Sequence, residues 1–133
     1  MLYICGMKLF LDDNRQPYDV FLKTIDPDYE NNSEWSIVSN FHEFINFIEK
    51  FGLPKLISFD HDLSIEHYLP ENQENIDYSS FKNKTGYDCA VWLVDYCLRN
   101  GFKIPNFKVH SQNEVGRINI FNKLSQSLGS HKP

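Results

Sequence analysis

Leu56-Ile57-Ser58-Phe59-Asp60-His61-Asp62 joins a short, almost continuous apolar run to three ionisable residues. A run of this length without helical periodicity is typical of a β-strand that is buried on both faces of a sheet. Similar runs occur at 8–13, 35–39 and 107–110, and each of them also ends in polar residues. We therefore predict four short buried strands, which pair in parallel because helical patterns separate them.

The first two strong helical patterns carry clear signals at both ends. Asn40 and Glu43 have the spacing of a capping box, and apolar residues then recur every three or four positions until 52–54, where a glycine and a proline end the helix. A second helix begins at Thr85 and stops at Gly101. Because its body is apolar on all sides, we expect this second helix to be deeply buried.

The remaining segments are less regular, apart from a closing helix. That helix is predicted to begin at Ser111, which has capping-box spacing to Glu114. Only a short helix around 19–23 is expected between 17 and 34, and the polar residues 63–84 are interpreted as a long loop that is either a lid or disordered. The stripe predicted to face the core from the closing helix consists of Val115, Ile118, Phe121, Leu124 and Leu128.

These elements predict one α/β domain over residues 1–133, with its core at 7–128. Strands that alternate with helices favour an open, mostly parallel sheet of about four strands with helices on both faces. Met7 could be the true start of the chain, in which case residues 1–6 are an extension.

Composition limits the possible partners. The chain has 13 Lys and Arg against 18 Asp and Glu, a formal net charge of −5, which argues against a non-specific grip on duplex DNA. No stretch approaches the roughly 18 apolar residues of a membrane span. Cys5, Cys89 and Cys97 lack zinc-knuckle or CxxC spacing and are expected to be buried free thiols. We therefore expect a cytoplasmic protein without duplex DNA or membrane partners, in an oligomeric state that the sequence leaves open.

Acidic residues follow two of the predicted strands, with Asp12 and Asp13 after the first and Asp60 and Asp62 after the third. The carboxyl ends of parallel strands meet at one edge of a sheet, so we expect these side chains in one pocket. Crowded carboxylates repel one another unless a cation neutralises them. The Asp12-Asp13 pair alone also fits a solvated turn. Together the four residues predict a divalent metal site, and oxygen ligands favour Mg²⁺ or Mn²⁺.

His61 and His110 follow the third and fourth predicted strands. Either residue alone fits a hydrogen-bonded structural histidine. At neighbouring strand ends, two imidazoles can take a proton from an attacking water or hydroxyl and give one to a leaving oxygen, as cleavage of a phosphate ester requires. Ligation of the metal is the other function open to them.

Three further residues are candidates for binding a phosphate. Ser111 and Asn113 precede the closing helix, whose N-terminal amides and dipole favour an anion. Helix capping explains the same two residues equally well. Arg15 could hold phosphate oxygens with its planar guanidinium, or it could form a surface salt bridge.

Four motifs occur in order along the chain: Leu11-Asp-Asp-Asn-Arg-Gln-Pro17, Phe59-Asp-His-Asp-Leu63, Thr85-Gly-Tyr-Asp88, and Val109-His-Ser-Gln-Asn113 with Gly116. From about 7 to 128 they resemble the cyclic-phosphate-processing receiver domain family, a divergent branch of the response-regulator receiver fold. The resemblance implies a receiver or flavodoxin-like sheet with strand order 2-1-3-4. It also implies Mg²⁺ at Asp12, Asp13 and Asp60, and a phosphoryl group near Thr85, Gly86 and Ser111.

Departures from ordinary receivers bear on the function. No fifth strand with the receiver's lysine is visible, and His61 and His110 stand where receivers have no such residues. The resemblance therefore implies hydrolysis of a bound phosphoester rather than signalling through an aspartyl phosphate. The activity proposed for the family is opening of cyclic phosphates on RNA ends or nucleotides.

Our leading hypothesis is a metal-assisted phosphodiesterase that opens a cyclic phosphate in a small phosphorylated substrate: a nucleotide, an RNA end or a cyclic nucleotide signal. Asp60, His61 and His110 would carry the catalysis. One alternative is a receiver-like module that senses a phosphorylated ligand or is phosphorylated at Asp60. Another is a phage or mobile-element protein that sequesters a nucleotide messenger.

Overall fold

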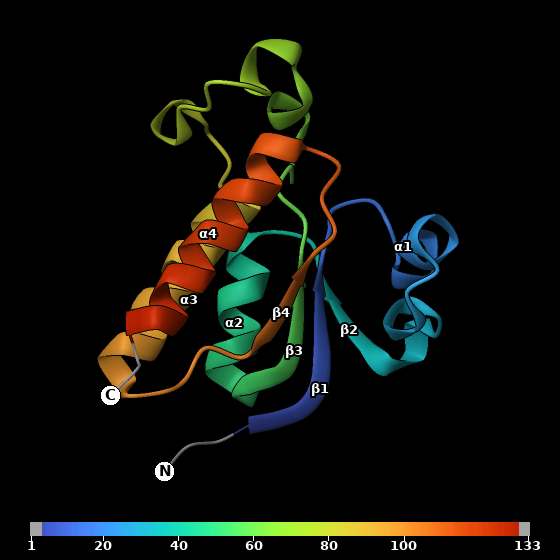
Figure 1. Cartoon of the computed structure of the whole chain (residues 1–133), viewed down its shortest axis with the longest axis vertical. Coiled ribbons are helices and arrows are strands. Elements are labelled where there is room, and N and C mark those ends of the chain that lie inside the picture. The colour runs from blue at the N-terminus through green and yellow to red at the C-terminus, as the bar shows by residue number, and fades with distance from the viewer. Residues whose placement is uncertain (1–3, 131–133) are drawn as a thin grey trace.

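The structure, a computed structural model, describes the backbone of residues 4–130 and the side chains of residues 6–126. Its main elements are β1 Ile4–Leu11, α1 Pro17–Thr24, β2 Trp35–Val38, α2 Phe41–Phe51, β3 Leu53–Phe59, α3 Gly86–Asn100, β4 Asn106–Val109 and α4 Glu114–Ser130. All strand pairs are parallel, in the order β2-β1-β3-β4 (Figure 1). The predicted fold class and strand order are confirmed.

Both faces of the sheet are covered, because successive side chains of a strand point to opposite sides. Leu9 and Leu11 of β1 and Ile57 of β3 belong to the larger core cluster, which they form with α2, α3 and α4. Figure 1 shows these three helices on one side of the sheet and α1 on the other. The smaller cluster lies on the side of α1 and consists of Phe10, Val20, Tyr29 and Trp35.

Two strands begin earlier than the sequence predicts. β1 begins at Ile4, which pairs with Leu53 of β3. Pro54 was expected to end the preceding helix, but it lies near the start of β3, a strand position that proline tolerates. Gly52, with φ of 92°, ends α2 without it. Residues 4–6 therefore belong to the sheet, although the predicted core begins at 7.

α3 begins and ends as predicted but is not buried on all sides. Thr85 and Asp88 form a capping box, and Gly101 ends the helix with φ of 70°. Leu98 is 52% exposed and Val91 is 36% exposed. The expectation of deep burial was wrong because the sheet and the neighbouring helices cover only part of the helix circumference.

α4 turns to the core a face that only partly coincides with the predicted one. Three residues of the predicted stripe are exposed, with relative exposures of 37% for Val115, 46% for Ile118 and 54% for Phe121. Leu124 is fully buried as predicted, and Ile120, which lies outside the predicted stripe, is fully buried as well. The Leu128 side chain lies outside the described residues.

The position of the helix cap explains this rotation. Asn113, not Ser111, caps α4, because its Oδ1 accepts a hydrogen bond from the Gly116 N–H at 3.0 Å. Gly116 then packs so closely on the His61 ring that an added Cβ would lie 2.3 Å from its Cγ. The inward face of α4 is therefore set by the contact with His61, which the apolar pattern does not register.

Residues 63–84 form a long loop, as the sequence predicts. The loop contains short 3-10 helices at Ile65–Tyr68, Pro70–Asn72 and Tyr78–Ser80. The buried His67 ties its two ends together: Nδ1 accepts from the Leu63 N–H and Nε2 donates to the Asn83 carbonyl, both at 2.8 Å. In Figure 1 the loop lies beyond the carboxyl ends of the strands.

Two of the three cysteines are buried free thiols, as predicted, namely Cys89 and Cys97. Burial raises the pKa of Cys97 to about 11, which makes this thiol unreactive at neutral pH. The side chain of Cys5 lies outside the described residues. Across residues 4–130, no helix has both the length and the apolar composition needed to cross a lipid bilayer.

Gly86 lies where the start of α3 meets the end of β3. Its N–H donates to the His61 carbonyl at 2.8 Å. A Cβ added here would lie 1.7 Å from the Asp60 carbonyl oxygen, and backbone atoms cannot easily move away. The absence of a side chain at this position therefore allows α3 to begin directly against the strand end that carries Asp60.

We predict that Gly86→Ala lowers the free energy of unfolding by about 3 kcal/mol or more, because the added methyl group overlaps the backbone of Asp60. Urea unfolding followed by circular dichroism measures the change. Gly6→Ala is the matched control, since nothing lies within 4 Å of an added Cβ there, and its effect should stay within about 1 kcal/mol. Equal effects of the two substitutions would contradict the close approach.

Candidate functional site

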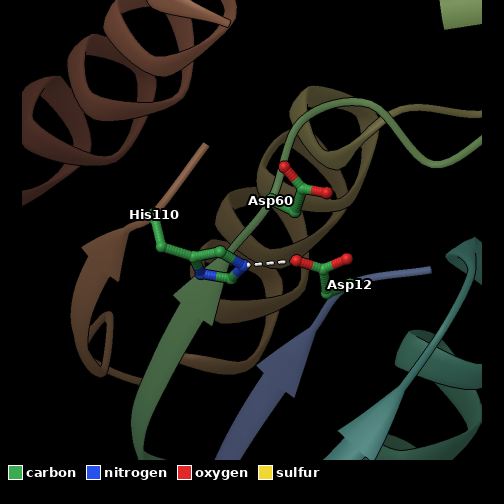
Figure 2. Close-up of side chains that lie close together, drawn as sticks. All are labelled: Asp12, Asp60 and His110. Carbon is green, nitrogen blue, oxygen red and sulfur yellow. Dashed lines mark hydrogen bonds and ion pairs between the residues drawn. The ribbon is translucent and has the colours of Figure 1, made fainter. Parts of the chain in front are cut away.

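Three side chains from three strand ends meet at the carboxyl edge of the sheet. The register pairs Leu11 with Phe59 and Phe59 with Val109, so the next residues, Asp12, Asp60 and His110, lie side by side. The backbone hydrogen-bond ladder continues through these residues. The Asp60 N–H donates to the Leu11 carbonyl at 2.9 Å, and the His110 N–H donates to the Phe59 carbonyl at 2.9 Å. Figure 2 shows the three side chains close together, with the His110 ring directed at Asp12.

This buried cluster could hold a metal ion. One ligand atom from each of Asp12, Asp60 and His110 lies within 4.8 Å of the others. Two carboxylates with an imidazole suit a divalent cation such as Mg²⁺, Mn²⁺ or Zn²⁺. The residues therefore fit the ion that the sequence predicts.

The two carboxylates of the cluster have opposite pKa shifts. Burial alone would raise the pKa of Asp12, but hydrogen bonds from the His110 ring and from the amides of Arg15 and Asn14 outweigh burial and hold it below the ordinary value. Burial and the charge of Asp12 raise the pKa of Asp60 to about 8. Without a cation the pair therefore shares about one negative charge at neutral pH, and a bound cation would allow Asp60 to ionise.

Arg15 supplies part of the missing positive charge. Its Nε lies 3.1 Å from Asp12 Oδ2, and its Nη2 lies 3.4 Å from Asp60 Oδ1 and 3.3 Å from the His110 carbonyl. The side chain is 22% exposed and lines a pocket beside the cluster. Arg15 is thus a half-buried counter-ion for the cluster rather than a surface salt bridge, and it remains accessible to an anion.

A small pocket of about 250 Å³ opens beside Asp60 and Asp62, and Asp12 is not part of its lining. Ser111 and Asn113, predicted to bind phosphate, line it, and the Ser111 Oγ accepts a hydrogen bond from the Asn113 N–H at 3.1 Å. Thr85 and Gly86 do not line it, since Thr85 is buried and bonded to Asp88. The complete lining is Asn14, Arg15, Asp60, Asp62, Tyr68, Gln73, Ser111, Gln112 and Asn113.

Asp62 and His61 form a second buried pair beside the pocket. His61 Nδ1 lies 2.6 Å from Asp62 Oδ1. Burial opposes ionisation of Asp62, but hydrogen bonds from His61, Gln73 and Asn113 prevail and hold its pKa below the ordinary value. Asp62 therefore orients the imidazole, and it lies outside the group of ligand atoms around Asp12.

Both imidazoles lie behind the carboxylates instead of in the pocket wall. The side chains of His61 and His110 are each 1% exposed. His61 contacts Gly116 of α4, whereas the ring of His110 is stacked on Phe10 of β1 at a centroid distance of 4.4 Å. The two histidines thus reach the site from opposite faces of the sheet.

The loop 63–84 contributes residues to which the sequence assigned no function. The Tyr68 hydroxyl lies 3.1 Å from Asp13 Oδ1 and 2.9 Å from the Asp62 carbonyl. The Tyr78 hydroxyl lies 2.9 Å from His61 Nε2, and burial raises the pKa of Tyr78 to about 12. Asp13 itself is exposed and, like Asp62, is not among the ligand atoms of the cluster.

Tyr29 and Ser58 were not identified from the sequence, although they are hydrogen-bonded to the site. Ser58 Oγ lies 2.6 Å from His110 Nδ1 and 2.6 Å from the Tyr29 hydroxyl. The only signal was a serine inside an otherwise apolar buried strand, whose hydroxyl needs a partner. Loop tyrosines such as Tyr78 gave a weaker signal, an aromatic side chain in a polar segment.

Comparison with known proteins agrees with the motifs and the fold. The family of cyclic-phosphate processing receiver domains matches this sequence over residues 7–126, from within β1 to within α4. No curated protein and no solved structure matches the chain. Since the match includes all four strands and the residues gathered at their carboxyl ends, the chain belongs to the cyclic-phosphate processing receiver domain family.

Proposed function

We propose that this protein is a phosphodiesterase that opens a cyclic phosphate on a nucleotide, an RNA end or a cyclic nucleotide signal, with help from a divalent cation. The observation that carries the proposal is the convergence of Asp12, Asp60 and His110 behind a pocket that Arg15 and Ser111 line. Family membership supports a cyclic phosphate as the ligand. The volume of the pocket, about 250 Å³, suits the phosphate end of a small substrate.

Asp12 and Asp60 would hold the cation, and Mg²⁺ or Mn²⁺ suits their oxygen ligands. The bound ion would polarise the phosphoryl group and neutralise its charge. Arg15 lines the pocket and can donate the N–H groups that the two carboxylates do not use to a phosphate oxygen. The Ser111 hydroxyl faces the same pocket and can donate to a second oxygen.

Proton transfer would fall to His61 and His110. A water oxygen attacks phosphorus and forms a new P–O bond, while the P–O bond to one ring oxygen breaks. One imidazole accepts the proton that the water loses, becomes an imidazolium and then gives this proton to the leaving oxygen. The other imidazole stabilises the leaving oxygen with a hydrogen bond from its N–H. The Tyr78 hydroxyl covers His61 Nε2, so this side chain must move for the ring to reach water.

A non-catalytic module that senses a phosphorylated ligand is the second candidate. It is favoured by the burial of both imidazoles, neither of which lines the pocket. Such a module would use Arg15 and Ser111 to bind the ligand without turnover. Phosphorylation at Asp60 is its signalling variant, and labelling by acetyl phosphate that Asp60→Asn abolishes would identify it.

We predict that Asp60→Asn raises the melting temperature of the metal-free protein by roughly 5 °C at pH 7. Burial beside Asp12 raises the pKa of Asp60 to about 8, so folded-state stability falls as pH rises from the ordinary carboxyl pKa through 8. The asparagine side chain of the variant does not ionise, so the variant does not have this loss of stability. Differential scanning calorimetry checks the change, and Asp95→Asn on an exposed residue should leave the temperature unaltered.

Mg²⁺ or Mn²⁺ should raise the melting temperature of the wild-type protein, because an ion that binds only the folded state stabilises it. Asp60→Asn should lose this response, since one ligand of the ion is gone. Removal of the metal with EDTA should restore the metal-free value. An undiminished response in the Asp60→Asn protein would show that the ion binds elsewhere.

Turnover is expected with 2′,3′-cyclic nucleotides or cyclic dinucleotides in the presence of Mg²⁺ or Mn²⁺, and EDTA should abolish it. Product formation, followed by chromatography, should fall at least about 100-fold in Asp12→Asn and in His61→Gln, because each loses a charge or a proton acceptor. Asp95→Asn should retain full activity. Tight binding without product in every case would instead support the sensing module.

A further inference from the structure

His110 is hydrogen-bonded through both of its ring nitrogens. Nε2 lies 3.0 Å from Asp12 Oδ2, and Nδ1 lies 2.6 Å from Ser58 Oγ. Ser58 Oγ in turn lies 2.6 Å from the Tyr29 hydroxyl. All four residues are buried, and the ring planes of His110 and Phe10 differ by only 6°. An unbroken hydrogen-bonded chain therefore runs from the candidate metal site to the small core cluster under α1.

Donor and acceptor chemistry gives this chain one direction. The Asp12 carboxylate can only accept, so Nε2 of His110 carries the proton. A neutral imidazole with its proton on Nε2 has its lone pair on Nδ1, which lies 2.6 Å from the Ser58 hydroxyl. Ser58 therefore donates to Nδ1, and Tyr29 donates to Ser58. In the reverse direction the Tyr29 hydrogen would have no acceptor among the hydrogen bonds of the described residues.

His61 has the opposite arrangement. The Asp62 carboxylate, 2.6 Å from Nδ1, can only accept, so Nδ1 carries the proton. Nε2 then has the lone pair and accepts from the Tyr78 hydroxyl at 2.9 Å. The Tyr78 oxygen also accepts a hydrogen bond from the Asn119 side-chain amide at 2.9 Å. The Tyr78 hydroxyl therefore has both a donor and an acceptor partner.

We propose that Ser58 and Tyr29 are positioning residues that hold His110 as its Nε2–H tautomer, so that His110 donates a hydrogen bond at the site and His61 alone presents a basic nitrogen. This proposal rests on the proposed phosphodiesterase function and deepens it, because it names the histidine that accepts the proton of the attacking water. A protonated Nε2 has no lone pair for a metal. The ion is therefore held by Asp12 and Asp60, and His110 supports Asp12 from behind.

The tautomers are measured by ¹⁵N nuclear magnetic resonance on the full chain at constant pH, without a metal and then with Mg²⁺. We expect an unprotonated Nδ1 and a protonated Nε2 for His110 in both samples, and the reverse pattern for His61. Loss of the Nε2 proton of His110 when Mg²⁺ binds would make the ring a metal ligand and overturn the proposal. A protonated Nδ1 of His110 in the metal-free protein would overturn it as well.

Two variants test the contribution of the hydroxyl groups. In Mg²⁺, where the charge of Asp12 is neutralised, Ser58→Ala should lower the ratio of the two His110 tautomers about fivefold, the effect of one neutral hydrogen bond. Tyr29→Phe should lower it less, because Ser58 can still donate. Unchanged His110 resonances in Ser58→Ala would refute the positioning function.

Matched controls separate these effects from general changes in packing. Ser36→Ala removes a hydroxyl from β2, which β1 separates from β3, and Tyr18→Phe removes one from a tyrosine that is 44% exposed. Both controls should leave the His110 resonances in place. The resonances are measured without substrate, so the two proposals can fail separately. An Nε2–H tautomer of His110 in a protein without turnover would contradict only the proposed function. An active enzyme with the opposite His110 tautomer would contradict only this inference.

Discussion

The hydrogen-bond ladder between β1 and β3 forces two carboxylates together at the edge of the sheet. Because Leu11 pairs with Phe59, the residues that follow them, Asp12 and Asp60, cannot separate without breaking the ladder. Both are buried, so their repulsion is only weakly screened by water. The guanidinium of Arg15 and the raised pKa of Asp60 offset it. A cation is the remaining means of holding both carboxylates ionised, and this links the fold directly to the proposed chemistry.

Each face of the sheet delivers one histidine to this edge. Asp12, Asp60 and His110 continue the alternation of Phe10, Ser58 and Lys108, so the ring of His110 packs among the residues under α1. The chain turns after Asp60, and His61 packs instead against Gly116 at the start of α4. The two imidazoles therefore have different neighbours, which is why their ring nitrogens can be protonated in opposite senses. Their environments are part of the two hydrophobic cores, so substitutions in either core can alter the site.

The sequence was sufficient to locate the four strands and their carboxyl ends, because short apolar runs that end in polar residues alternate with helical segments, but it placed the starts of β1 and β3 three or four residues too late. It also brought Asp12, Asp60 and His110 to one edge, since parallel strands leave no other arrangement. It failed for α4, where the polar contact between Asn113 and Gly116 outweighs the apolar stripe and rotates the helix. It could not reveal Tyr29, Ser58 or Tyr78 as neighbours of the histidines. Tyr29 and Tyr78 lie in connecting segments, and their positions depend on how these segments fold back over the sheet. Ser58 lies in β3, where a serine in an apolar run indicates only that its hydroxyl needs a partner and not which residue that partner is.

The charges around the pocket bear on the order of events and on the choice of ligand. Without a cation, ionised Asp12 and Asp62 face one positive group, Arg15, so a phosphate would meet net negative charge. A divalent cation bound at Asp12 and Asp60 would cancel this net negative charge even with Asp60 ionised, which favours binding of the ion before the phosphate. A cyclic phosphodiester carries a single negative charge, whereas the monoester formed by ring opening carries about −1.5 to −2 at neutral pH. The added charge lies close to Asp62 and Asp12, and the resulting repulsion would favour departure of the opened product over its re-closure.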